Sequence, residues 1–140
     1  MKKTTILTGL LVVISIFLSV GSRYIFPGCQ GLKENGDFMR CHWAQNAITL
    51  VAATNSVIYL FGLITKNTHI RAGMVMAATI TNCAVIALAN NIVIKLCMSK
   101  DMHCFTSMKP MVNIIASVII ILGVIDYIFA LKEGKNINVK

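Results

Sequence analysis

Four apolar runs constrain the fold of this sequence more than any other feature. They cover residues 4–22, 44–65, 72–94 and 110–131. Each run is close to the ~20 residues that an α-helix needs to cross ~30 Å of hydrocarbon. Only 13% of the residues are charged, whereas soluble domains usually carry about 25%. The sequence therefore predicts an all-α integral membrane protein with four membrane-spanning helices.

The segments between these runs are too short to form a second domain. Two larger loops, residues 23–43 and 95–109, alternate with a short connection around residues 66–71. We therefore expect residues 1–140 to form one transmembrane domain, a four-helix bundle built from two helical hairpins. A cleaved signal peptide is the alternative for the first run, because Lys2 and Lys3 precede it and small residues lie near its end.

The distribution of basic residues sets the expected orientation. The segments that contain the two termini and the connection around residues 66–71 are short and rich in lysine and arginine, and such segments usually face the cytoplasm. Both termini are therefore expected in the cytoplasm, with the two larger loops outside. The net charge of +8 is explained by contact with anionic lipid head groups. The lipid bilayer is thus the expected partner, and no nucleic acid is expected.

Each of the two outer loops holds a pair of cysteines. Cys29 and Cys41 lie in the first loop, and Cys97 and Cys104 lie in the second, whereas Cys83 lies within a span. In the expected orientation the loop cysteines face the oxidising side of the membrane, where disulfides persist. Four cysteines permit three pairings, and proximity in sequence favours Cys29 with Cys41 and Cys97 with Cys104. Structural disulfides, with no cofactor, are the favoured interpretation.

A thiol–disulfide oxidoreductase is the first alternative. Small four-helix membrane enzymes that pass electrons from thiols to quinone also carry a cysteine pair in each of two outer loops, and the arrangement here is similar. Cys41 and Cys104 would be the reactive thiols, because each has a cationic neighbour that favours the thiolate. Cys29 and Cys97 would be their partners. The sequence lacks the Cys-x-x-Cys spacing on which such enzymes generally rely.

Soft-metal or haem binding is the second alternative. Methionine, histidine and cysteine cluster in both loops, and thioether, imidazole and thiolate ligands suit copper(I). The haem-attachment pattern Cys-x-x-Cys-His is absent from the sequence, and no Cys/His spacing matches a zinc finger. The residues that would hold such a metal are Met39, Cys41, His42, Met102, His103 and Cys104.

Asparagine residues lie within the second and third predicted spans. Lipid gives no hydrophobic drive for helices to associate, so we expect polar side chains to hold the helices together. One antiparallel register aligns Asn55 with Asn82 and also Asn46 with Asn91. This coincidence predicts that the two helices touch. A polar pathway for a proton or a small solute is the alternative role.

Asp126 is the only acidic residue within a predicted span. It lies ~1.5 helical turns from Lys132, close enough to the inner interface to reach water. We expect it to pair there, with Thr5 or Thr8 on the first helix as its partner. A part in proton relay is the alternative, because acidic residues within membranes often serve such functions.

Two strings in the loops resemble a known family. MRCHWAQNA leads from the first outer loop into the second span, and CMSKDMHCFTSMKP leads from the second outer loop into the fourth. Both are similar to a bacterial family of small four-span membrane proteins catalogued only as a domain of unknown function. The resemblance implies a multi-pass protein of the prokaryotic cytoplasmic membrane with an accessory role, and a transporter component is the implied partner. We therefore expect a non-catalytic accessory or structural subunit with disulfide-pinned outer loops.

Overall fold

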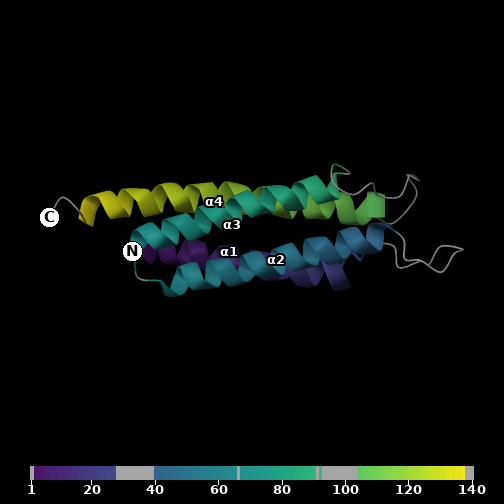
Figure 1. The fold of residues 1–140 in the computed structure, drawn as a ribbon, viewed down its shortest axis with the longest axis horizontal. Helices are drawn as coiled ribbons and strands as arrows, with labels where there is room; N and C mark the ends of the chain where they lie inside the picture. Colours follow the sequence, from purple (N-terminus) through teal and green to yellow (C-terminus); the bar gives the residue numbers. More distant parts are fainter. Residues whose placement is uncertain (1, 28–39, 66, 91, 93–103, 138–140) are drawn as a thin grey trace, which may run out of the picture.

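Four long helices make up most of the described part of the protein. The computed structural model describes residues 2–27, 40–65, 67–90, 92 and 104–137. The helices are α1 (Lys2–Tyr24), α2 (Arg40–Ile64), α3 (Thr68–Ala89) and α4 (Lys109–Ile137), and the π-helical turn η1 (Cys104–Met108) leads into α4 (Figure 1). The described residues contain no strand. The prediction of an all-α fold is confirmed.

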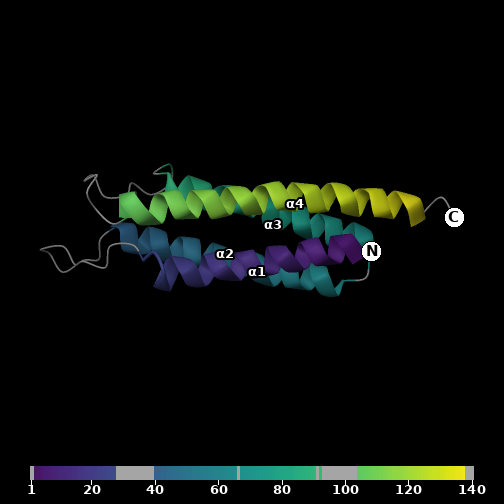
Figure 2. The ribbon, with the colours of Figure 1, turned by 180° about the vertical axis from the view of Figure 1, so that it is seen from behind.

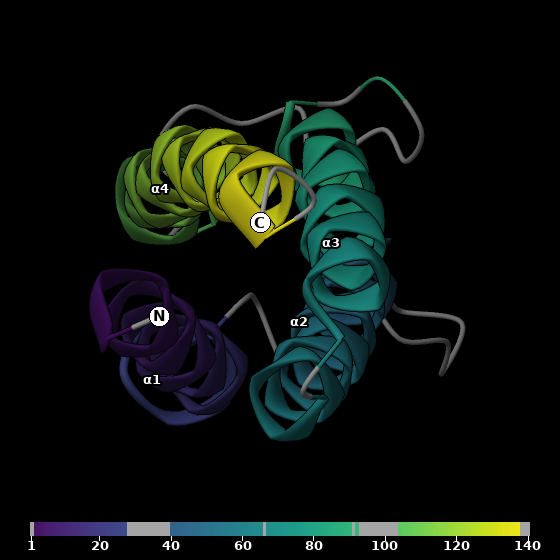
Figure 3. The ribbon, with the colours of Figure 1, turned by 90° about the vertical axis from the view of Figure 1, so that its left-hand side faces the viewer.

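The helices form a bundle in which each helix contacts two neighbours. α1 packs against α2 and α4, and α3 packs against the same two helices. Seen along its length, the bundle places the four helices around a common axis (Figure 3). The start of α1 and the end of α4 lie at one end of the bundle (Figures 1 and 2), which we call the terminal end. The opposite end, where α1 ends and α2 begins, is the distal end.

The helix boundaries are set by local hydrogen bonds as well as by hydropathy. α3 begins at Thr68, before the apolar run, because the Asn67 side chain caps it by accepting a hydrogen bond from the His69 backbone N–H at 3.1 Å. Asn90 closes the same helix, because its backbone N–H bonds to the Ile86 carbonyl at 3.0 Å. A helix can thus extend beyond the apolar run that predicts it.

The outward faces of the helices are apolar. Ile6 on α1 is 72% exposed and Leu50 on α2 is 69% exposed. All four helices are long and apolar enough to cross a membrane. Water would solvate such a surface poorly, whereas lipid chains match it. The described helices therefore indicate a multi-pass membrane protein whose outer surface contacts a lipid bilayer.

An apolar layer crosses the core on the distal side of its middle. Leu18, Ala52, Val85 and Ala116 come from the four helices and are almost fully buried. Because the side chains are small or medium in size, the helix backbones can approach one another closely. Polar side chains are buried on both sides of this layer: Ser22 and Gln45 toward the distal end, and a longer series toward the terminal end.

α3 and α4 lie close together at Gly123. A Cβ atom at this position would collide with the Thr79 side chain, including its hydroxyl, whereas a Cβ at Gly9 on α1 would meet nothing within 4 Å. Gly123 is therefore required for the contact between α3 and α4, and Gly9 is not required for packing.

We expect the Gly123→Ala variant to be destabilised by about 1–3 kcal/mol, because an overpacked core must shift its helices. Gly9→Ala is the matched control, and we expect it to stay within about 0.5 kcal/mol of the wild type. Reversible unfolding in mixed micelles measures both values. Equal stability of the two variants would show that the α3–α4 contact tolerates a methyl group.

Candidate functional site

Arg71, Thr8 and Asp126 link three helices near the terminal end. Nη2 of Arg71 on α3 donates a hydrogen bond to the Thr8 hydroxyl on α1. That hydroxyl lies 2.6 Å from Oδ2 of Asp126 on α4, to which it donates. Of the two threonines considered from the sequence as partners for Asp126, Thr8 is the one in contact. A single hydroxyl thus joins a guanidinium group to a carboxylate.

A second contact joins α1 and α4 closer to the terminal end. The Thr4 hydroxyl donates to Oε2 of Glu133 at 2.6 Å. Thr4 and Thr8 are one helical turn apart, and Asp126 and Glu133 are two turns apart, so each pair lies on one face of its helix. This spacing explains why two threonines of α1 face two carboxylates of α4.

Sequence reasoning missed Arg71, and it also missed the Thr4–Glu133 contact. The sequence places Arg71 in the short connection between two spans, where basic residues usually face water. It is instead only 9% exposed, and its Nη1 lies 3.4 Å from the Thr5 hydroxyl. The early start of α3 turns Arg71 toward the bundle axis. The capping residue Asn67 is the signal from which this start could have been predicted.

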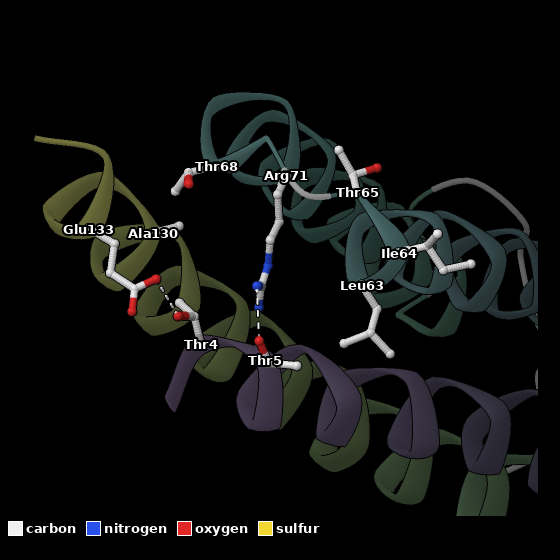
Figure 4. Close-up of a pocket in the computed structure, with 9 residues that line it drawn as sticks. All are labelled: Thr4, Thr5, Leu63, Ile64, Thr65, Thr68, Arg71, Ala130 and Glu133. Atoms are coloured by element: carbon white, nitrogen blue, oxygen red, sulfur yellow. Dashed lines mark hydrogen bonds between the residues drawn. The ribbon is translucent and has the colours of Figure 1, made fainter. Parts of the chain in front are cut away.

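A pocket of about 140 Å³ opens beside this cluster at the terminal end. Figure 4 shows Arg71 reaching from α3 toward Thr5, while Glu133 on α4 points toward Thr4. A cationic and an anionic group therefore face the same space from different helices. The pocket is lined by Thr4, Thr5, Leu63, Ile64, Thr65, Thr68, Arg71, Ala130 and Glu133.

Asn55 and Asn82 lie deeper in the bundle, on α2 and α3. The hydroxyls of Tyr59 on α2 and Thr79 on α3 lie 3.4 Å apart. About one turn from this contact toward the distal end, Asn55 on α2 lies at the level of Asn82 on α3. The prediction that these helices touch is confirmed. The side-chain amide of Asn82 nevertheless donates to the Ala78 carbonyl of its own helix at 3.0 Å. Neither Nδ2 nor Oδ1 of Asn55 has a hydrogen-bond partner among the described residues.

Asn90 and Asn113 form a reciprocal amide pair between α3 and α4. Each side chain donates to the other's oxygen, at 2.9 and 3.1 Å. Sequence reasoning missed this pair because it matched asparagines only between the second and third spans. Asn46 accepts a hydrogen bond from Nη1 of Arg23 at 3.4 Å, and Asn91, its predicted partner, lies outside the described residues.

The cysteines and their neighbours are described in part. Cys41 lies in the first turn of α2, is fully buried and is disulfide-bonded. Cys83 is an exposed free thiol on α3. The ring of His42 lies edge-on to Trp43, with 6.3 Å between ring centroids. The predicted site residues Cys29, Met39, Cys97, Met102 and His103, and the side chain of Cys104, lie outside the described part of the chain.

The candidate copper or haem ligands can be compared with the structure at two positions only. Cys41 and His42 are described, whereas the side chains of the other four predicted ligands are not. Within the described residues, no group of three or more His, Cys, Asp or Glu side chains is placed to hold a metal ion. The metal site therefore stays a prediction that depends on the loops.

These features define a class of protein: a small multi-pass membrane protein with a four-helix fold and a charged polar cluster at one end of its core. The chain belongs to the family described as domain of unknown function DUF4418, which it matches over residues 11–129. The resemblance to a domain of unknown function is thereby confirmed. No curated protein and no solved structure matches the chain.

Replacing Thr8 tests the link between Arg71 and Asp126. We expect Thr8→Val to destabilise the protein by about 1–3 kcal/mol or more, because it leaves a buried guanidinium and a buried carboxylate without their shared partner. Thr8→Ser keeps the hydroxyl and should stay close to the wild type. Thr54→Val is the control, since Thr54 is exposed and its hydroxyl bonds only to its own helix. Unfolding in mixed micelles gives the comparison, and a stable Thr8→Val would contradict the link.

A double-mutant cycle tests the Asn90–Asn113 pair. We expect a coupling of ~0.6–1.7 kcal/mol between Asn90→Ala and Asn113→Ala, the range found for polar contacts between membrane helices. The four unfolding free energies of the cycle provide this value. Strict additivity of the two substitutions would show that the amide pair does not stabilise the bundle.

Proposed function

We propose that this protein is a non-catalytic accessory subunit of the bacterial cytoplasmic membrane. Its termini lie in the cytoplasm, and the loops at residues 23–43 and 95–109 lie outside. Disulfides between Cys29 and Cys41 and between Cys97 and Cys104 hold these loops in shape. The loops and the outer helix faces contact another membrane protein, such as a transporter component.

The observation that carries this proposal is the burial of Cys41. Its side chain has no exposed surface, and it is disulfide-bonded. Thiol–disulfide exchange requires a thiolate to approach one sulfur of the bond, so access limits the reaction. A sulfur packed inside the bundle is shielded from such attack. This burial favours a structural bond over a catalytic one.

The same bond supports the proposed orientation. Disulfides persist on the oxidising side of the cytoplasmic membrane and are rare in the reducing cytoplasm. Cys41 lies at the distal end, so a persistent bond there favours a distal end outside the cell. An even number of spans then returns both termini to the cytoplasm.

The outer face of α3 supports contact with a partner helix. Gly73, Ala77 and Ala84 are small, exposed and spaced by about one turn or two. Small residues on a lipid-facing surface let a second helix approach closely, which is how helices associate in membranes. A subunit that docks on a larger membrane protein would use such a face.

Alkylation in intact cells tests the proposal. A membrane-impermeant maleimide is added before and after a strong reductant, and the added mass is counted on the Cys83→Ser variant, which removes the free thiol of α3. We expect no label on Cys29, Cys41, Cys97 and Cys104 before reduction and four labels after it.

Other labelling patterns would contradict the proposal in distinct ways. A pair that a mild dithiol reduces and that reoxidises on its removal would favour the quinone-linked oxidoreductase. Thiols that react without any reductant would favour a copper or haem site in the loops. No labelling after reduction of intact cells, with labelling after lysis, would reverse the orientation.

A further inference from the structure

The buried polar residues of the terminal half follow one another along the bundle axis. Thr8 and Asp126 lie next to the pocket, and the Tyr59–Thr79 contact lies about one turn deeper. Asn55 follows one more turn along α2. All five residues are less than 5% exposed. Together they extend from the pocket toward the middle of the membrane.

Ser15, Asn55 and Asn82 form the deepest polar layer. The hydroxyls of Ser22 on α1 and Thr49 on α2 lie 2.9 Å apart, which fixes how these two helices align. About two turns from this contact toward the terminal end, Ser15 on α1 lies at the same level as Asn55 on α2. Asn82 reaches the same level from α3. The three side chains are at most 1% exposed. They therefore occupy one cross-section of the core.

Polar atoms at both ends of this series lack hydrogen-bond partners within the described residues. Near the pocket these atoms are Nε of Arg71 and Oδ1 of Asp126. In the deepest layer they are Oγ of Ser15, Nδ2 and Oδ1 of Asn55, and Oδ1 of Asn82. Hydrocarbon offers no replacement partner, so each such atom is costly unless something else bonds to it.

The unpartnered atoms of the deepest layer match the bonding capacity of water. Asn55 offers one donor group and one acceptor, Asn82 offers an acceptor, and the Ser15 hydroxyl can do either. A buried water typically makes two to four hydrogen bonds to polar groups that the protein leaves unsatisfied. One or two waters can therefore satisfy this layer.

Within the described residues, the entry for water lies at the terminal end. The pocket opens at the terminal end beside Arg71 and Glu133. On the distal side, the core is closed by an apolar layer whose residues are at most 1% exposed, namely Leu18, Ala52, Val85 and Ala116. Ile48, Ala89 and Val112 continue it about one turn further, where α1 contributes the buried Ser22. Water is excluded from such packed apolar layers.

We propose that the terminal half of the bundle is a blind hydrated shaft. Ordered water enters it through the pocket between Arg71 and Glu133, passes Thr8, Asp126 and the Tyr59–Thr79 pair, and ends at Ser15, Asn55 and Asn82. The shaft brings water from the terminal-end compartment to the middle of the membrane and leaves the distal half sealed. This property is independent of the accessory role.

Silver(I) accessibility tests the shaft. Ser15→Cys and Val85→Cys are made separately in the Cys83→Ser background and placed in lipid nanodiscs. Silver(I) is carried by water and displaces the thiol proton to form a silver thiolate. After timed exposure, the protein is dissolved in SDS and the remaining thiol is counted with a chromogenic disulfide. The amount of thiol lost by the Cys83→Ser protein alone is subtracted from that of each cysteine variant.

We expect Ser15→Cys to react at least about tenfold faster than Val85→Cys, because only the former lies on the hydrated side of the apolar layers. Thr65→Trp, which places a large ring at the pocket, should slow the Ser15→Cys reaction. Equal rates at residues 15 and 85 would overturn the shaft, and an unchanged rate with Thr65→Trp would overturn entry through the pocket.

A measurement on the unsubstituted chain guards against misfolded variants. Protein labelled with ¹⁵N-asparagine is placed in lipid bilayers, and magnetisation transfer from water to each side-chain amide is recorded by solid-state NMR. We expect transfer to Asn55, with the exposed Asn67 as the positive reference. Transfer to Asn67 without transfer to Asn55 would overturn the proposal.

Discussion

Inside a bilayer a polar side chain can bond only to the protein itself or to water that the protein admits, and the terminal half of this bundle depends on that constraint. The Thr8 hydroxyl accepts from Arg71 and donates to Asp126, so that three helices meet at one oxygen. The Thr4–Glu133 contact repeats the α1–α4 link one turn further out. Because these contacts close the ring of helices, the position of the pocket follows from them.

The two ends of the bundle differ in the way they are held together. The terminal end relies on charged and hydroxyl side chains around a pocket, and it leaves several buried polar atoms for water. The distal half relies on packed small and aliphatic residues, on the Asn90–Asn113 amide pair and on the disulfide-bonded Cys41. Packing and amide contacts thus hold the distal half, whereas charged and hydroxyl contacts hold the terminal half.

The fold could be predicted from hydropathy because each apolar run is long enough to cross the membrane and therefore has few alternatives. The contact between α2 and α3 could also be predicted, since asparagines in both spans favoured an antiparallel pair of helices. The role of Arg71 could not be predicted, because the direction in which its side chain points depends on where α3 begins, and the cap Asn67 sets that start. The Asn90–Asn113 pair was missed because asparagines were matched only between the second and third spans, whereas Asn113 lies in the fourth.

The sequence by itself determined the number of helices, their alternation across the membrane and the family to which the chain belongs, because hydropathy and the loop strings are local properties. The tertiary structure decided which polar groups meet: Arg71 with Thr8, Thr8 with Asp126, and Ser15 at the level of Asn55. Such meetings depend on how helices from distant parts of the chain rotate and slide against one another. These rotations are fixed by packing among all four helices, such as the close approach of Gly123 to Thr79.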